Sequence, residues 1–197
     1  QNVMQKWIDG TISNFEYLML LNIYSGRSFN NSSQYPFLPW IIMDYESDRI
    51  NPIFLRDLSK PVGALNQERL NLILETYEEK KRSGIPPFLY SSGQTCPLGL
   101  YYWLVRVEPF TTFHIDMQGG SFDHADRVFS SWKQAAHLVL TMNDMYRELP
   151  PEAFYMHDFM VNYNGLYLGL GQENGESSVS DPYENDIETS EDVRKDE

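Results

Sequence analysis

Cysteine, long apolar runs and basic residues are all scarce in this sequence. The single cysteine, Cys96, excludes an intramolecular disulfide and fits a reducing compartment. No apolar run approaches the roughly 20 residues that a membrane-spanning helix needs. There are 15 Lys and Arg against 28 acidic residues, a net charge of −13, and no basic stripe. This balance argues against a nucleic-acid partner and against a purely electrostatic attachment to anionic lipid.

The sequence also lacks the common signatures of catalytic and metal sites. Its four histidines form no H-E-x-x-H motif, and one cysteine cannot build a thiolate zinc cage. There is no G-x-S-x-G elbow, P-loop or dinucleotide glycine fingerprint. Asp123, His124 and Asp126 can be drawn as a metal-binding or hydrolytic cluster, although a hydrogen-bonded turn is the commoner use of such residues. We expect no catalytic residue, metal or cofactor, and a lipid-directed hydrolase using this cluster is the alternative.

Acidic charge is concentrated at the C-terminal end of the chain. Residues 171–197 hold ten acidic and two basic residues, a net charge of −8, and few apolar side chains. A segment of this composition has too little to bury to fold by itself. The sequence therefore predicts a folded domain over residues 1–170 and a disordered acidic tail over residues 171–197.

The most apolar stretch runs from Ile12 to Tyr45, and its first half predicts a helix. Ser13 is a candidate N-cap, Glu16 follows at the capping-box spacing, and Gly26 fits the left-handed position that closes a helix. Apolar side chains cover almost the whole circumference between these ends. A helix that is apolar all round is usually buried, so we expect this one to be buried on most sides.

The second half of this stretch predicts an extended segment inside the same core. Pro36 and Pro39 disfavour both a helix and a central strand. The residues around them are nevertheless aromatic or aliphatic: Tyr35, Phe37, Trp40, Ile41 and Ile42. Buried irregular backbone needs side-chain hydrogen-bond partners. The expected suppliers are Arg27, Asn30, Gln34, Asp44 and, further along, Arg56 and Asp57.

Further helices are predicted over residues 66–82, 98–107 and 129–148, with a short one between Pro109 and Gly119. In the first of these, Leu70, Ile73, Leu74 and Tyr77 follow helical spacing and Asn66 is the expected cap. Arg106 and Glu108 end the second, either as a buried salt bridge or at its mouth. Leu55 and Leu58 are expected to point inward from the loop over residues 44–60, together with Ile53 and Phe54.

Several blocks of this sequence resemble one known family. They occur in the order ISNFEYLMLLN, GRSFN, QYPFLPWIIMDY, LRDLSKPVGALN, YYWLVRVEPFT, GGSFDHADRVF and ELPPEAFY, with short gaps. Together they are similar to the BEACH domain of the neurobeachin and Chediak–Higashi/beige proteins. The likeness covers about residues 5 to 169, roughly the first two-thirds of such a domain.

The resemblance implies a mainly α fold in which helices pack around a core of extended, non-regular segments. It also implies a non-enzymatic scaffold that mediates protein interactions in vesicle or endolysosomal trafficking or in autophagy. The implied partners are proteins, including a PH-like domain and WD40 repeats of the parent protein. The implied location is cytoplasmic, peripheral to endosomal, lysosomal or other vesicle membranes, with membrane association through partners.

The residues that match the family blocks are the expected structural or interaction residues. Most of them should form a buried polar lattice, and a subset should face a partner: Asn14, Arg27, Tyr35, Trp40, Arg56, Asp57, Lys60, Arg106, Glu108, Asp123 and Arg127. The chain departs from the family pattern at Asn31, where an Asp is usual, and at residues 93–95, where a His-Tyr-Ser run is usual.

Overall fold

The computed structural model describes residues 2–45, 47, 49, 55–90, 96–122, 128–142, 146–166 and 168. This part of the chain is mainly helical, as expected. Its elements are α1 (Val3–Ile8), α2 (Asn14–Tyr24), η1 (Ser32–Gln34), η3 (Val62–Ala64), α3 (Gln67–Arg82), α4 (Pro97–Trp103), α5 (Phe110–Met117), α6 (Trp132–Thr141) and α7 (Glu152–Tyr155). The acidic tail predicted over residues 171–197 lies outside the described residues.

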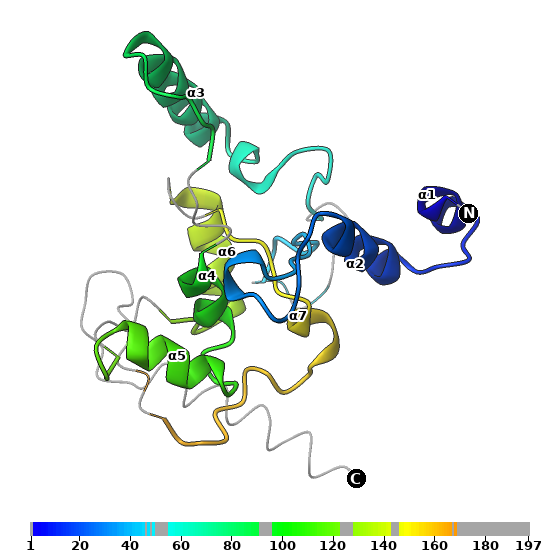
Figure 1. The fold of residues 1–197 in the computed structure, drawn as a ribbon, viewed down its shortest axis with the longest axis vertical. Helices are drawn as coiled ribbons and strands as arrows, with labels where there is room; N and C mark the ends of the chain where they lie inside the picture. The colour runs from blue at the N-terminus through cyan, green and yellow to red at the C-terminus, as the bar shows by residue number, and fades with distance from the viewer. Residues whose placement is uncertain are drawn as a thin grey trace.

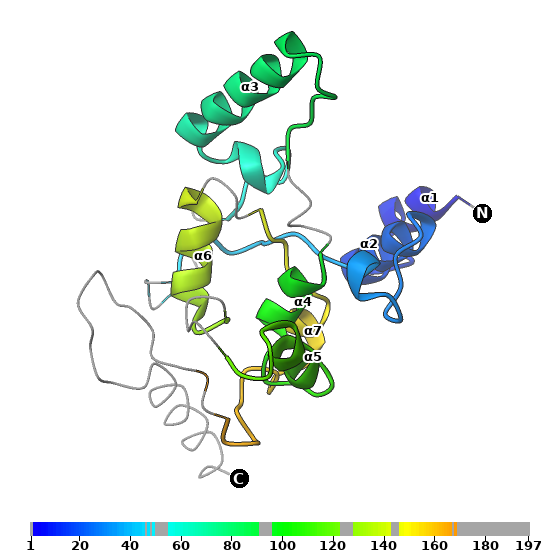
Figure 2. The ribbon, with the colours of Figure 1, turned by 60° about the vertical axis from the view of Figure 1, so that its left-hand side comes forward.

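The molecule consists of a body and two arms (Figures 1 and 2). Helices α4, α5, α6 and α7 gather around irregular segments to form the body. Helices α1 and α2 pack on each other and extend to one side, while α3 projects from another part of the body beyond η3. Both arms leave large areas of helix surface outside the core.

The core is an aromatic cluster centred on Trp40, which is fully buried. Its ring makes edge contacts with Trp103 at 5.5 Å, Trp132 at 5.7 Å and Tyr45 at 5.9 Å between centroids. Tyr35 and Leu38, from the same extended segment, are also buried. The prediction that the proline- and aromatic-rich segment lies in the core is therefore confirmed, except that Ile41 is 37% exposed.

Local signals determine where the helices begin and end. Ser13 and Glu16 form both halves of a capping box at the start of α2, and Asn66 caps α3 through the backbone N–H groups of Glu68 and Arg69. Gly26 and Gly84 follow these helices with positive φ values of 81° and 70°. Because such conformations are strained for residues with a Cβ, glycine closes both helices.

The predicted burial of α2 is wrong. Leu21, Ile23 and Tyr24 are 43%, 58% and 69% exposed, and Asn22 is the helix's buried residue. The helix lies on an arm and meets the body along one side, where Phe15 packs edge-on against Tyr155 at 6.2 Å. All-round apolarity was thus a misleading sign of burial in this helix.

Two predicted helices are shorter in the structure. The helix predicted over residues 98–107 is α4, which ends at Trp103. The buried turn after it places Leu104 in the main core and Val105 in a second small cluster with Val128 and Leu168. The helix predicted over residues 129–148 is α6, which ends at Thr141, and the backbone of Met142 is extended. The chain needs that change of direction because Leu149 pairs with Leu38 of the central segment.

The loop before η3 is less buried than predicted. Leu55 and Leu58 are 44% and 59% exposed, so the expectation that both point inward is wrong. Ile53 and Phe54 lie outside the described residues. Backbone pairing contributes to holding this loop to the body, since the Arg56 N–H donates to the Ile41 carbonyl at 2.9 Å.

Candidate functional site

Four of the predicted residues, Arg27, Tyr35, Trp40 and Arg56, lie in or contact one feature, the central strip, which we define as residues 35–42. Leu38 exchanges backbone hydrogen bonds with Leu149 at 2.7 and 2.9 Å on one side. Ile42 forms an antiparallel bridge with Leu55 on the other. These pairings use only some of the backbone N–H and C=O groups of the strip. Side chains must therefore form hydrogen bonds with other buried backbone groups.

Asn22 and Arg27 tie the strip to the end of α2. The Asn22 amide accepts from the Phe37 N–H at 3.1 Å and donates to the Phe37 carbonyl at 2.9 Å. Arg27 donates to the Tyr35 carbonyl at 3.0 Å, and its guanidinium lies 4.3 Å from the centre of the Phe37 ring. Both side chains therefore replace the neighbouring strand that a regular sheet would supply.

Glu148 is the main anchor of the strip on the opposite side. Its carboxylate accepts from the Trp40 N–H at 3.1 Å and pairs with Arg56 at 2.6 Å. The Arg56 and Glu148 side chains are only 4% and 10% exposed. The Trp40 indole donates to the Arg147 carbonyl at 2.9 Å, which holds the ring in the centre of the core.

A second buried carboxylate lies at the start of the strip. Glu152, the first residue of α7, accepts hydrogen bonds from the phenols of Tyr35 at 2.6 Å and Tyr155 at 3.1 Å. Burial, followed by the hydrogen bond to Glu152, raises the pKa of Tyr35. Burial and the nearby Glu152 charge raise the pKa of Tyr155 to about 12. Both phenols are therefore neutral donors at physiological pH.

The other predicted residues lie apart from the strip or outside the description. Asp57 and Lys60 form an exposed pair at 3.4 Å. Asn14 accepts from the Trp7 indole at 2.8 Å in the α1–α2 arm. Arg106 is buried and donates to the Phe129 carbonyl at 2.7 Å. Glu108 is exposed and accepts from the Thr112 hydroxyl at 2.9 Å, so it forms no buried salt bridge with Arg106.

The alternative hydrolytic cluster remains an expectation. Asp123, His124, Asp126 and Arg127 lie outside the described residues. Among the residues that the structure describes, no group of three or more His, Cys, Asp or Glu side chains is arranged to hold a metal ion.

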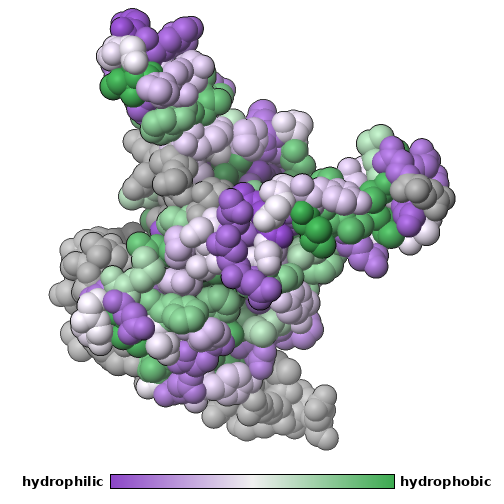
Figure 3. All heavy atoms as spheres, in the orientation of Figure 1, coloured by the Kyte–Doolittle hydropathy of each residue, from purple (hydrophilic) through white to green (hydrophobic). Residues whose placement is uncertain are grey.

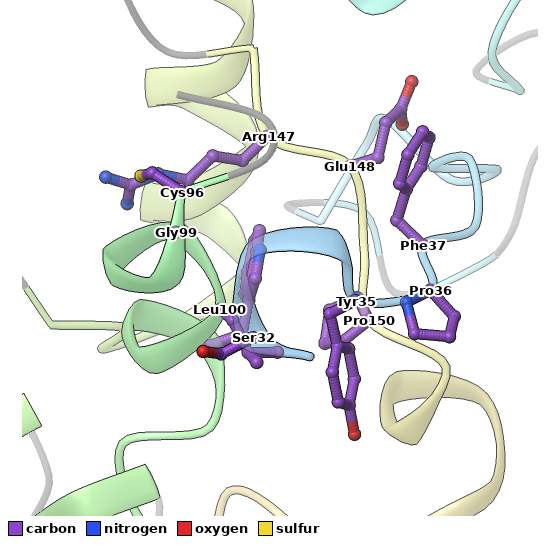
Figure 4. Close-up of a pocket in the computed structure, with 11 residues that line it drawn as sticks. Ser32, Tyr35, Pro36, Phe37, Cys96, Gly99, Leu100, Arg147, Glu148 and Pro150 are labelled. Atoms are coloured by element: carbon purple, nitrogen blue, oxygen red, sulfur yellow. The ribbon is translucent and has the colours of Figure 1, made fainter. Parts of the chain in front are cut away.

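A small open pocket lies beside the strip, between η1, α4 and residues 147–150 (Figure 4). It is lined mostly by apolar side chains and backbone: Ser32, Tyr35, Pro36, Phe37, Cys96, Gly99, Leu100, Trp103, Arg147, Glu148 and Pro150. Figure 4 draws Cys96 and Arg147 on one side of the view and Phe37 and Glu148 on the other.

The α1–α2 arm carries the larger apolar surface. Ile8 is 61% exposed, and Leu21, Ile23 and Tyr24 form what we call the α2 outer face. The rings of Trp7 and Tyr17 stack at 4.6 Å, which joins the two helices into one unit. Apolar residues gather on this arm in Figure 3. An exposed apolar patch of this kind is typical of a protein-binding surface.

Sequence reasoning did not predict the roles of Glu148, Glu152 or Arg69. Glu148 and Glu152 flank Leu149-Pro150-Pro151 in the ELPPEAFY block, and their place in that block is the signal that would have found them. Arg69 is only 2% exposed, although it belongs to a helix predicted to face solvent. Its guanidinium donates to three carbonyls in two segments: Val62 in η3, and Val139 and Met142 at the end of α6.

Comparison with known proteins agrees with the resemblance in the sequence. The family model described as "Beige/BEACH domain" matches residues 5–186, and so continues beyond the boundary expected at residue 170. BEACH domain-containing protein B from Arabidopsis thaliana is 42% identical over 176 residues, which is 88% of this chain and 7% of that protein. BEACH domain-containing protein lvsD from Dictyostelium discoideum is 41% identical over 174 residues, which is 87% of this chain and 6% of that protein. The chain thus spans a small part of the length of either relative.

Proposed function

This chain belongs to the Beige/BEACH domain family, and from that premise we propose that it is a non-enzymatic scaffold module. Its role is to bind other proteins in vesicle or endolysosomal trafficking or in autophagy. Its place is the cytoplasmic side of endosomal, lysosomal or other vesicle membranes. Among the described residues, no helix is long and apolar enough to cross a bilayer.

The exposed α2 outer face is the observation that carries this proposal. Around the central strip, the side chains of Asn22, Arg27 and Glu148 are engaged with backbone groups or with Arg56. Groups used in this way stabilise a fold and are poorly placed to act on a substrate. Ile23 and Tyr24, by contrast, are apolar and more than half exposed. Apolar side chains that remain in water favour a partner that covers them.

A PH-like domain of the parent protein is the proposed occupant of the α1–α2 arm. The family resemblance places such a domain directly before this one, and the arm is the N-terminal part of the described fold. WD40 repeats of the parent protein are the second proposed partner. The pocket beside the strip, which is lined mostly by apolar residues, is a further proposed contact point.

Affinity capture tests the proposal. The tagged chain is used to recover bound proteins from cytosol and from vesicle membranes, with and without the PH-like domain added. Wild type is compared with Ile23→Asp/Tyr24→Asp, which places charge on the α2 outer face. Leu58→Asp is the control, because Leu58 is 59% exposed but lies outside the arm. We expect the arm variant to lose the PH-like domain and the control to retain it.

Two results would contradict the proposal. One is a set of captured proteins with no trafficking, lysosomal or autophagy component. The other is equal retention of the PH-like domain by wild type, the arm variant and the control. Circular dichroism of each variant checks that the helices are intact, so that loss of binding is not loss of fold. Trp40→Ala is unsuitable as a surface variant because Trp40 is fully buried.

A further inference from the structure

The α3 arm ends in a tip where basic and exposed apolar residues lie together. The helix runs outward from η3, Gly84 turns the chain with a φ of 70°, and the following residues return along the arm (Figures 1 and 2). We define the α3 tip as residues 80–89. It lies at the far end of a projecting helix, so it can reach a surface that the body does not touch.

The α3 tip holds the only run of three basic residues in the sequence, Lys80-Lys81-Arg82. These residues form the last turn of α3. Lys81 is well exposed, at 63% of its side chain, and lies 3.8 Å from Glu78. Arg82 is exposed and donates to the Glu78 carbonyl, which leaves most of its guanidinium in solvent. Residues 80–89 therefore carry a charge of +3 in a chain whose net charge is −13, although Glu78 and Glu79 directly precede them.

Exposed apolar side chains follow this basic run directly. Ile85, Phe88 and Leu89 are 53%, 50% and 44% exposed. Pro86 and Pro87 between them are exposed as well, and they limit the freedom of the segment. Basic residues beside exposed Phe, Leu and Ile are typical of segments that lie in the interface of a membrane.

The contact between Lys80 and Phe88 gives this arrangement a specific geometry. The Lys80 ammonium lies 3.9 Å from the centre of the Phe88 ring. A lysine can extend its apolar stem along such a ring while its charge stays in the polar layer. Phe88 at the level of the acyl boundary would thus leave the ammonium at the level of the lipid phosphates.

From this geometry we propose that the α3 tip binds the surface of a bilayer that contains anionic phospholipid. Lys81 and Arg82 face the headgroups, and Ile85, Phe88 and Leu89 enter the interface. The net negative charge of the chain opposes the approach, so the apolar side chains and the local bases are both required. Attachment by this tip alone is weak, which fits a contact that assists protein partners in placing the molecule on a membrane.

Vesicle flotation with the purified 197-residue chain tests the proposal. The vesicles contain phosphatidylcholine alone or mixed with phosphatidylserine, and the partition coefficient is measured at low and high salt. We expect binding to the mixed vesicles that weakens with salt. Lys81→Gln/Arg82→Gln should lower the partition coefficient by about thirtyfold, following the usual contribution of a basic residue near an anionic surface. Phe88→Ser should also lower it.

Matched controls test whether vesicle binding depends on the α3 tip or on the total charge and apolar surface of the chain. Lys60→Gln/Lys133→Gln removes two positive charges from elsewhere on the surface, and Leu58→Ser removes an apolar side chain that is 59% exposed, against 50% for Phe88. Both should bind vesicles as wild type does. Far-ultraviolet circular dichroism confirms that each variant keeps its helices.

Three results would overturn the proposal. They are no binding to the mixed vesicles, equal losses in tip variants and controls, and loss of a captured protein by tip variants that still float as wild type does. The last result would assign the tip to a protein partner. Because the vesicles contain no protein, failure here is distinguishable from failure of the proposed scaffold function.

Discussion

At the scale of single residues, Glu148 is the side chain on which the central strip depends most. It accepts from the Trp40 backbone and pairs with Arg56 in a nearly buried position. Glu148→Ala would leave the Arg56 guanidinium buried beside an unpaired backbone N–H. We expect the free energy of unfolding to fall by about 3–5 kcal/mol, measured by urea denaturation.

The exposed pair of Asp57 and Lys60 provides the control for this prediction. Their side chains are 48% and 55% exposed, and such pairs contribute about 0–1 kcal/mol. Lys60→Ala, which removes the pair and leaves the Asp57 hydrogen bonds with Ser59 in place, should therefore change the free energy of unfolding little. Equal losses in Glu148→Ala and Lys60→Ala would show that the buried pair is not the anchor of the strip.

Tyr45 should make the free energy of unfolding depend on pH in the alkaline range. It stacks on Trp132 at 5.8 Å, and burial raises its pKa to about 12. The unfolded chain releases the same proton near pH 10, at about the reference value. The stabilisation by the neutral phenol is therefore fully present below about pH 10 and is lost as the pH rises towards about 12.

Tyr45→Phe isolates this contribution. Urea denaturation at several pH values should show a falling midpoint above about pH 10 in wild type and a shallower fall in the variant. Some dependence should remain in the variant because Tyr35 and Tyr155 also have raised pKa values. Identical pH profiles for the two proteins would contradict the assignment.

The residues of the strip were predictable to different degrees. Trp40 and Arg27 could be predicted because prolines and aromatics close together indicate buried irregular backbone, which needs polar partners nearby. The role of Glu148 could not, since its contacts with Trp40 span more than 100 residues of sequence. Hydrogen bonds between distant segments depend on the tertiary fold, and no local spacing records them.

At the scale of elements, helix ends were easier to predict than helix surroundings. The caps at Ser13 and Asn66 involve residues two or three positions apart, so the sequence contains the whole interaction. Whether α2 is buried depends on what packs around it, and its even distribution of apolar residues gave no preferred side. The early end of α6 has a similar cause, because the pairing of Leu149 with Leu38 redirects the chain.

The cap of α2 can be tested directly. Ser13→Ala removes the side chain that accepts from the Glu16 N–H at 3.1 Å and also the donor to the Glu16 carboxylate. We expect a loss of about 1 kcal/mol, mainly as faster amide exchange in the first turn of α2. Exchange in α6, which has its own cap at Ser131, should not change.

Arg69 should determine how firmly α3 is attached. Its guanidinium joins α3 to the carbonyls of Val62 in η3 and Val139 in α6. Arg69→Met would leave these buried carbonyls without that donor, each at about 1–3 kcal/mol. Amide exchange across residues 67–82 should accelerate more than exchange in α5. Arg82→Met, on the exposed end of the same helix, is the control and should change exchange only near residue 82.

At the scale of the whole molecule, charge and exposed apolar surface act against each other. The net charge of −13 at pH 7 keeps copies of the chain apart, although both arms expose apolar side chains. Near the isoelectric point of about 4.6 this repulsion disappears, while the apolar surfaces remain. We expect self-association, measured by light scattering, to rise steeply as the pH falls from 7 towards 4.6.

A variant of the α2 outer face tests whether the association depends on the arms or only on the loss of net charge. Ile23→Lys/Tyr24→Lys replaces two exposed apolar residues of the α2 outer face with charged ones. Each protein is measured at the same difference between the solution pH and its own isoelectric point. If apolar contacts between arms cause the association, this variant scatters less light than wild type under these matched conditions. Leu58→Lys, which changes an exposed residue away from both arms, should associate as wild type does. Equal scattering from all three proteins would place the cause in charge neutralisation alone and remove the arms from the explanation.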